Sequence, residues 1–304
     1  IILTVHFGSS YANAFWNSSI GQFVFGDGYG FVYADDVVAH EMTHAVTTYE
    51  SHLFYYQQSG AINEALSDIF GEFIDQQNGR GADSDAVKWL VGEDITGYSN
   101  PRNMKDPTAN GYADKMSSSN YICGDTDNGG VHKNSGIGNK AAYLMTDGGS
   151  FNGYTISGIG PTKTAQIFYR VQTELLTSAS DYSDLYNAVN TSCSSLVGQY
   201  GITTANCGEV NKALLAVEMN GNPNSSYCKA KTAPVCSAGL TPQYTFSDDL
   251  EDTNSGNWTL ITDGGSTNYW AYPQNPNYLN ADMTNATSGV TNLFGYDAPT
   301  AGDY

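Results

Sequence analysis

Apolar and polar positions alternate over short runs in the first 34 residues. These runs, from Ile1 to Phe7 and onward, are rich in aromatic residues and are interrupted by Gly26-Asp27-Gly28 and by Gly30. Alternation between glycine turns is typical of short strands. The pattern predicts a β-rich segment over residues 1–34.

From residue 35 the apolar spacing becomes helical. Asp36 can cap a helix that runs to about Tyr49, and a second helix is expected from near Ser59 to Gly79. The apolar face of the second helix would carry Ala61, Ile62, Ala65, Ile69 and Phe73. Similar spacing predicts further helices at about 135–147, 161–177, 181–197 and 207–219, so residues 35–221 should form a mainly helical lobe.

The residue composition changes again after Gly221. Residues 222–242 are expected to form a linker, and no Lys or Arg follows Lys231. Residues 243–304 place aromatic residues among Thr, Asn and Gly, which predicts a β-sandwich-like appendage. The aromatic side chains would either fill its core or line a binding face; they are Trp258, Tyr269, Trp270 and Tyr272. Because the chain opens in mid-strand and ends without a closing element, we expect a fragment whose appendage is incomplete.

Composition narrows the possible partners and the compartment. The 304 residues carry 12 Lys+Arg against 31 Asp+Glu, a net charge of −19, which disfavours nucleic acid and anionic membrane surfaces. The sequence shows no apolar stretch long enough to cross a bilayer. Only 14% of residues are charged, and the polar, largely neutral surface this implies suits a secreted, extracellular protein.

Five cysteines support an oxidising compartment but are too few for a disulfide scaffold. Proximity in sequence suggests two local pairs, Cys193 with Cys207 and Cys228 with Cys236. Cys123 is then left over. It could be a small buried apolar residue, a free thiol or part of an intermolecular bridge, and we expect the first.

The strongest chemical signal is His40-Glu41-Met42-Thr43-His44. Four-residue spacing puts both imidazoles on one helix face, where they can hold one zinc ion. Glu41 lies at a different angle of the helix and is the natural general base for an activated water.

Catalytic zinc requires a third protein ligand. The next helix offers Glu64 and Asp68, again four apart: Glu64 could bind zinc while Asp68 accepts the spare N–H of a zinc-bound histidine. The alternative is that these are ordinary polar residues on two solvated helix faces, which the pairing of the two helices disfavours.

Four stretches, at residues 11–17, 36–47, 59–71 and 127–137, together resemble the thermolysin-like family of zinc metalloendopeptidases. The resemblance covers roughly residues 4–219. It implies an α+β fold in which a remnant of the β-rich N-terminal lobe precedes the helical C-terminal lobe of the catalytic domain. It also implies zinc binding by His40, His44 and Glu64, with Glu41 as the base.

The resemblance assigns further roles that spacing alone does not show. Tyr55 and His132 match hydrogen-bond donors to the oxyanion, and Asp127 matches the carboxylate that orients the histidine. Substrate would bind along the edge-strand residues Asn13 and Ala14 and would contact Arg102. A pocket near Val37 and Val91 would favour a bulky apolar residue after the cleaved bond.

Four acids match positions where the family binds calcium: Asp36, Glu72, Asp75 and Glu93. Oxygen ligands from several points of the chain suit that ion. Lys88, Trp89 and Leu90 stand where some relatives have further acids, which argues for one calcium ion. The alternative is that the four acids cap helices and face water.

Two functions follow from these patterns. The first is a secreted, zinc-dependent endopeptidase that acts on proteins or peptides. The second is a non-catalytic module that binds a polysaccharide or a matrix protein through its aromatic tail.

Overall fold

The computed structural model describes residues 1–81, 84–99 and 101–223, and beyond these residues 252, 255–258, 270–271 and 294–295. The chain divides into two units, Ile1–Ala230 and Lys231–Tyr304. In the second unit, β8 (Trp270–Ala271) pairs antiparallel with β9 (Phe294–Gly295). The rest of the predicted appendage, almost all of the linker and the Cys228–Cys236 pair lie outside the described residues.

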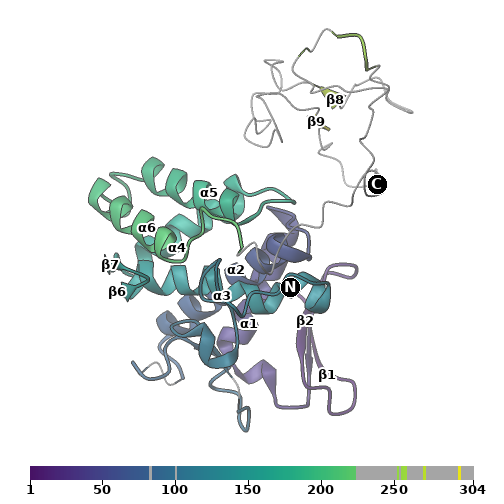
Figure 1. The fold of residues 1–304 in the computed structure, drawn as a ribbon. Helices are drawn as coiled ribbons and strands as arrows, with labels where there is room; N and C mark the ends of the chain where they lie inside the picture. Colours follow the sequence, from purple (N-terminus) through teal and green to yellow (C-terminus); the bar gives the residue numbers. More distant parts are fainter. Residues whose placement is uncertain are drawn as a thin grey trace. The chain divides into compact units, whose positions relative to one another are not determined.

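The first unit opens with a small sheet, coloured purple in Figure 1. It consists of β1 (Leu3–Phe7), β2 (Ala14–Asn17) and β3 (Gln22–Gly26) in the order β1-β3-β2. β1 runs parallel to β3 and β2 runs antiparallel to it. β2 is therefore an edge strand, and the predicted short strands near the start of the chain are confirmed.

Two adjacent helices follow the short 3₁₀ helix η1 (Phe31–Tyr33): α1 (Asp35–Tyr49) and α2 (Gln57–Asn78). α2 ends at Gly79, whose φ of 69° is the left-handed conformation that glycine adopts most readily. α1 and α2 pack closely because Gly71 has no side chain: a Cβ there would lie 2.8 Å from the Asp36 carbonyl oxygen. Both predicted helices are confirmed to within about two residues.

α3 (Thr126–Asp147) begins earlier than the predicted residue 135. Its first turn is irregular, because residues 127 to 130 all have positive φ, and regular helix follows only after Gly130. The predicted helix over 161–177 is interrupted: α4 (Pro161–Arg170) continues as the π-helical turn η3 (Val171–Leu175). The chain then forms α5 (Tyr182–Ser195) and α6 (Thr204–Ala216), which side chains of Asp181 and Thr203 cap.

Short elements complete the unit. β4 (Leu90–Val91) pairs with β5 (Arg102–Asn103), and β6 (Gly148–Phe151) pairs with β7 (Tyr154–Ser157). The 3₁₀ helix η2 spans Pro107–Asn110. No helix among the described residues is both long enough and apolar enough to span a membrane.

The main hydrophobic core lies among the helices of the first unit, with α2 and α3 at its centre (Figure 1). Ile62, Leu66 and Ile69 of α2 pack there with Ile137 and Met145 of α3, all essentially without exposure to solvent. The fold is thus α+β with a mainly helical lobe, as predicted.

Cysteine pairing is partly as predicted. Cys193 and Cys207 form a disulfide that joins α5 to α6, with 5.6 Å between their Cα atoms. Cys123 is exposed and disulfide-bonded, so the expectation of a small buried apolar residue is wrong. The sequence offered Cys123 no neighbouring cysteine, so spacing gave no sign of its bond.

Candidate metal centre and catalytic cleft

A cleft of about 500 Å³ opens in the first unit, between the edge strand β2 and the helices α1 and α2. Its walls combine residues that are far apart in the sequence. Those predicted for the site that line it are Asn13, Ala14, Val37, His40, Glu41, His44, Tyr55, Glu64, Val91, Arg102 and His132. The cleft therefore brings together most of the candidate residues.

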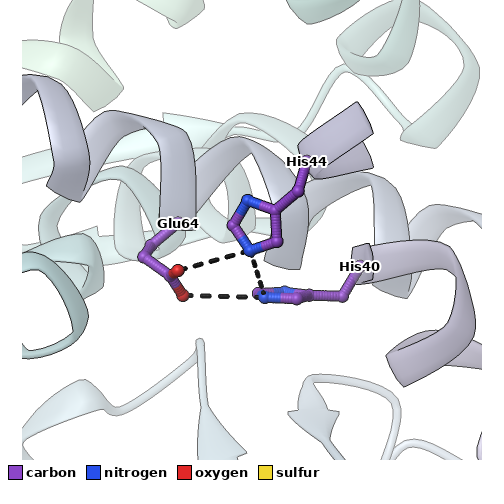
Figure 2. Close-up of side chains that lie close together, drawn as sticks. All are labelled: His40, His44 and Glu64. Carbon is purple, nitrogen blue, oxygen red and sulfur yellow. Dashed lines mark hydrogen bonds and ion pairs between the residues drawn. The ribbon is translucent and has the colours of Figure 1, made fainter. Parts of the chain in front are cut away.

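Three side chains converge on one point of this cleft (Figure 2). His40 and His44 project from α1 one turn apart, with 3.0 Å between their Nε2 atoms. Glu64 reaches them from α2: its Oε2 lies 3.6 Å from His40 Nε2, and its Oε1 lies 3.3 Å from His44 Nε2. All three side chains are largely shielded from solvent.

This donor set fits zinc. Bond lengths of about 2.0–2.2 Å in a tetrahedral site place neighbouring ligand atoms about 3.3–3.6 Å apart. The three separations, 3.0, 3.3 and 3.6 Å, are close to those values. Two imidazoles and one carboxylate would occupy three positions and leave the fourth open toward the cleft, as catalytic zinc sites require.

Each histidine is oriented through its other nitrogen. His40 Nδ1 lies 2.8 Å from Asp68 Oδ1. His44 Nδ1 lies 2.8 Å from Asn63 Oδ1 and 3.1 Å from Ser67 Oγ. These contacts fix both rings so that their Nε2 atoms face Glu64. Sequence reasoning found Asp68 but missed Asn63 and Ser67, although their i, i+4 spacing on α2 was a usable signal.

The electrostatics of the centre favour a bound cation. Burial raises the pKa of Glu64, but the neighbouring histidines, His44 first, outweigh burial and hold that pKa well below its usual range. Burial lowers the pKa of His44, and the Glu64 carboxylate more than reverses this, raising it to about 9. The Glu64 carboxylate is thus held ionised in a buried position, ready to accept positive charge.

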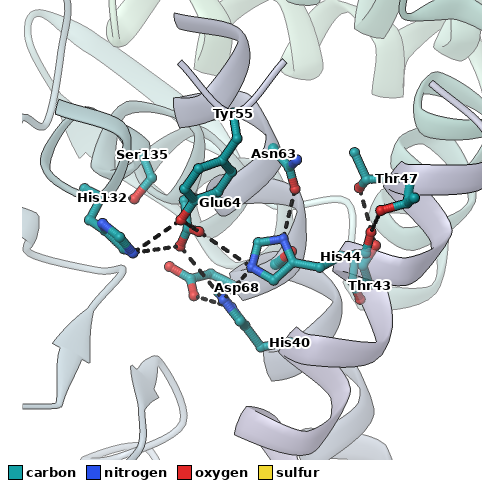
Figure 3. Close-up of polar contacts among 12 residues, drawn as sticks. His40, Thr43, His44, Thr47, Tyr55, Asn63, Glu64, Asp68, His132 and Ser135 are labelled. Carbon is teal, nitrogen blue, oxygen red and sulfur yellow. Dashed lines mark hydrogen bonds and ion pairs between the residues drawn. The ribbon is translucent and has the colours of Figure 1, made fainter. Parts of the chain in front are cut away.

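Tyr55 and His132 approach the same point from the opposite wall (Figure 3). The Tyr55 hydroxyl donates to Glu64 Oε1 and lies 3.3 Å from His132 Nε2. His132 Nε2 lies 3.6 Å from Glu64 Oε2. Two polar groups therefore meet beside the point where His40, His44 and Glu64 converge.

The irregular start of α3 holds His132. Asp127, with a φ of 57°, places Oδ1 2.6 Å from His132 Nδ1 and accepts the His132 backbone N–H at Oδ2, 3.0 Å away. Gly129 and Gly130 also have positive φ, and a Cβ on Gly129 would lie 2.6 Å from the Gln57 side chain. The left-handed turn at residues 127 to 130 therefore places the Asp127 carboxylate next to the His132 imidazole.

Glu41 and Arg102 complete the polar wall of the cleft. Glu41 is 5% exposed and lines the cleft beside the two histidines. Arg102 binds Asp68 with both arms of its guanidinium, through Nη2 to Oδ1 at 2.5 Å and through Nε to Oδ2 at 3.1 Å. Burial raises the pKa of Asp68, but Arg102 and His40 outweigh it and lower that pKa to about 2.

Comparison with known proteins decides the family. Residues 51–219 match the family described as "Thermolysin metallopeptidase, alpha-helical domain", and residues 1–48 match "Thermolysin metallopeptidase, catalytic domain". The chain belongs to the thermolysin family of metallopeptidases. The resemblance inferred from the sequence motifs is confirmed.

Individual relatives agree with this membership. A "Zinc metalloproteinase" of Renibacterium salmoninarum is 45% identical over 215 residues, which cover 68% of this chain and 38% of the relative. A "Bacillolysin" of Bacillus cereus is 42% identical over 226 residues, covering 71% and 38%. The chain therefore spans under two fifths of the length of these curated relatives.

A solved structure supports the fold. It is described as "Precursor of Protealysin, Metalloproteinase from Serratia proteamaculans", with 31% sequence identity and a TM-score of 0.57. The match covers 71% of this chain and 68% of that chain.

Within this thermolysin-family chain, the edge strand β2 presents free backbone groups to the cleft. The Asn13 carbonyl accepts the Gly26 N–H at 3.0 Å. Because peptide groups alternate sides along a strand, the N–H and C=O of Ala14 point to the unpaired edge. Both residues line the cleft, beside the buried side chains of Val37 and Val91.

The four acids predicted to bind calcium do not form one group. Asp36, Glu72 and Glu93 lie together, whereas Asp75 groups with Asp35 and Asp94. Sequence reasoning missed Asp35 and Asp94, because their proximity depends on how the segment after β4, which carries Asp94, folds against the start of α1.

Carboxylates of the first group are poorly compensated by the protein. Glu72 Oε1 and Glu93 Oε2 are buried without a hydrogen-bond partner, while Asp36 accepts the Gly92 N–H. Burial, followed by repulsion from Asp36, raises the pKa of Glu93 to about 8. Burial also raises the pKa of Glu72 well above its usual range and raises that of Asp36. Three close acids with raised pKa values are the environment that a divalent cation would relieve.

Proposed function

We propose that this thermolysin-family chain belongs to a zinc-dependent endopeptidase that hydrolyses proteins or peptides. The observation that carries the proposal is the convergence of His40, His44 and Glu64 on one point beside the cleft. Secretion fits the Cys193–Cys207 disulfide, because such bonds persist in oxidising compartments.

The chain's own groups can perform each proton and charge step. When bound, zinc would supply a Lewis acid that polarises the scissile carbonyl and lowers the pKa of the attacking water. Glu41 takes the proton of that water and passes it to the leaving amine. Tyr55 and His132 donate hydrogen bonds to the oxyanion, and the contact of Asp127 with His132 Nδ1 orients the ring so that Nε2 faces the cleft.

Substrate would bind in extended form along β2. The free backbone groups of Ala14 can add the peptide as a further strand, and Arg102 can meet a substrate carbonyl from the opposite wall. The buried apolar surface of Val37 and Val91 supports a preference for a bulky apolar residue after the scissile bond.

Calcium is proposed at Asp36, Glu72 and Glu93, supported by their proximity and their uncompensated carboxylate oxygens. The ion would be structural, because the group ties the start of α1 to α2 and to the loop after β4. Asp75 is proposed as a ligand only of the neighbouring group with Asp35 and Asp94.

The alternative of a polysaccharide- or matrix-binding module gains no support from the described residues. Of its four aromatic residues, Tyr269 and Tyr272 lie outside that part of the chain. We therefore propose the peptidase function and not the binding module.

Glu41→Gln tests the proposal. The amide keeps the shape of the side chain but cannot take a proton, so hydrolysis of a blocked peptide should fall by about 10²- to 10⁴-fold. Zinc content, measured by mass spectrometry, should stay at one ion per chain. Glu50→Gln, at the exposed end of the same helix, is the matched control. A Glu41→Gln variant with near-normal turnover would remove Glu41 from this role.

A further inference from the structure

Asp68, the carboxylate behind the candidate zinc ligand His40, has a fourth donor that the family motifs did not point to. Its side chain is fully buried. Oδ1 faces His40 Nδ1 and Arg102 Nη2, whereas Oδ2 accepts from Arg102 Nε at 3.1 Å and from Asn139 Nδ2 at 2.8 Å.

The orientation of the Asn139 amide follows from chemistry. A carboxylate can only accept hydrogen bonds, so the NH₂ group must face Asp68. Asn139 is 2% exposed, and its Oδ1 is buried without a partner. The Asn139 amide therefore contacts Asp68 through its nitrogen, while its oxygen bears the cost of burial without a hydrogen bond.

Helix packing makes this contact possible. α3 approaches α2 closely because Gly138, the neighbour of Asn139, faces Ala65: a Cβ on Gly138 would lie 2.6 Å from the Ala65 Cβ. The short side chain of Asn139 can therefore cross from α3 to Asp68 on α2.

The two donors to Oδ2 differ in their exposure to substrate. Arg102 lines the cleft, and its side chain is 25% exposed. Asn139 is absent from the described lining of the cleft. If substrate engaged the Arg102 guanidinium, the hydrogen bond from Asn139 to Asp68 would remain available.

We propose that Asn139 is a positioning residue that fixes Asp68, and through it the imidazole of His40, independently of substrate. The inference rests on the proposed zinc site. The hydrogen bond of Asn139 goes to Asp68 and not to a candidate metal ligand, and Asn139 does not line the cleft, so its effect should appear first in zinc affinity.

The test compares Asn139→Leu and Asn139→Asp with the parent in the full chain. Zinc affinity is measured by competition with a fluorescent chelator. Loss of an outer contact to a metal ligand typically costs about 10- to 100-fold in affinity. We expect about tenfold weaker binding for Asn139→Leu. Asn139→Asp should bind more weakly still, because it places a second carboxylate against Asp68.

Two further readouts separate positioning from general damage. The visible absorption spectrum of the cobalt-substituted chain should shift in both variants, because the His40 ring is no longer held in one orientation. Asn211→Leu on α6 removes an amide oxygen that accepts the Tyr186 hydroxyl at 2.8 Å. Neither residue lines the cleft, so zinc affinity and the cobalt spectrum should stay unchanged.

The outcomes are distinct. Parental zinc affinity and an unshifted cobalt spectrum in both Asn139 variants would overturn the inference while leaving the proposed peptidase intact. A parent chain that binds no zinc would overturn both. Asn139→Ser removes the same contact with a smaller side chain and decides the question if the aspartate variant does not fold.

Discussion

Each imidazole of the candidate metal centre is held at its Nδ1 atom, and this leaves Nε2 free to bind an ion. Asp68 serves His40, and Asn63 with Ser67 serves His44. The Glu64 carboxylate lies between them in a buried position. Because no ligand has to reorient when the ion arrives, zinc binding should cost little conformational entropy.

Tyr55→Phe tests the oxyanion role directly. Removing one preorganised donor typically lowers kcat by about 10²- to 10³-fold, and KM should change little because the donor acts mainly in the transition state. Peptide hydrolysis by the variant gives both constants. Zinc content must be measured too, because the same hydroxyl contacts Glu64.

Tyr56→Phe is the matched control for this change. Tyr56 is the next residue, it is exposed, and its hydroxyl donates to Asp125 at 2.9 Å instead of facing the cleft. Turnover should stay at the parental value in this variant. Equal losses in the two variants, or an unchanged kcat for Tyr55→Phe, would contradict the assignment.

The helices α1, α2 and α3 carry the candidate zinc ligands, Glu41 and His132, and the sequence predicts some of these residues' contacts but not others. Spacing along α1 and α2 foretold His40, His44, Glu64 and Asp68, because residues four apart share a face whatever the rest of the fold does. Asn139 could not be found this way, because its contact depends on how closely α3 approaches α2.

Backbone conformation limited the prediction in a second place. Positive φ at Asp127 and Asn128 has no reliable signal in a single sequence, so α3 was expected to begin too late. The sequence also gave no sign of how the acids predicted to bind calcium are grouped. Which carboxylates meet depends on how the segment after β4, which carries Glu93 and Asp94, folds against α1 and α2, and the sequence favoured one set where the structure has two.

The acidic group on α1, α2 and the following loop predicts a pH-dependent stability in the chain stripped of divalent cations. Folding raises the pKa of Glu93 from its ordinary 4.5 to about 8, and those of Asp36 and Glu72 rise too. Between pH 4.5 and about pH 8, Glu93 is therefore protonated in the native state and ionised in the unfolded state. Stability should therefore fall as the pH rises from about 4.5 to about 8.

Calcium should reverse this loss. Melting temperatures at pH 5 and pH 8.5, with and without added calcium alone, should show stabilisation that grows with pH. Glu93→Gln is the control: it removes one charge, so the metal-free variant should lose less stability with pH and respond less to calcium. A calcium response equal at both pH values, or unchanged by the substitution, would count against the site.

The first unit as a whole places an edge strand, a buried polar wall and a three-ligand centre around one cleft. Family membership could be predicted from four short motifs, and the α+β fold followed from it. Family membership alone does not give a mechanism; the positions of the side chains around the cleft do. Its single requirement is that His40, His44 and Glu64 bind the same ion.

X-ray absorption at the zinc edge of the zinc-loaded chain measures that requirement most directly. The account predicts two imidazole nitrogens at about 2.0–2.1 Å and carboxylate oxygen at about 2.0–2.2 Å. In Glu64→Gln the carboxylate contribution should disappear while both imidazoles remain. A first shell containing fewer than two imidazoles, or one unaltered by Glu64→Gln, would contradict the account.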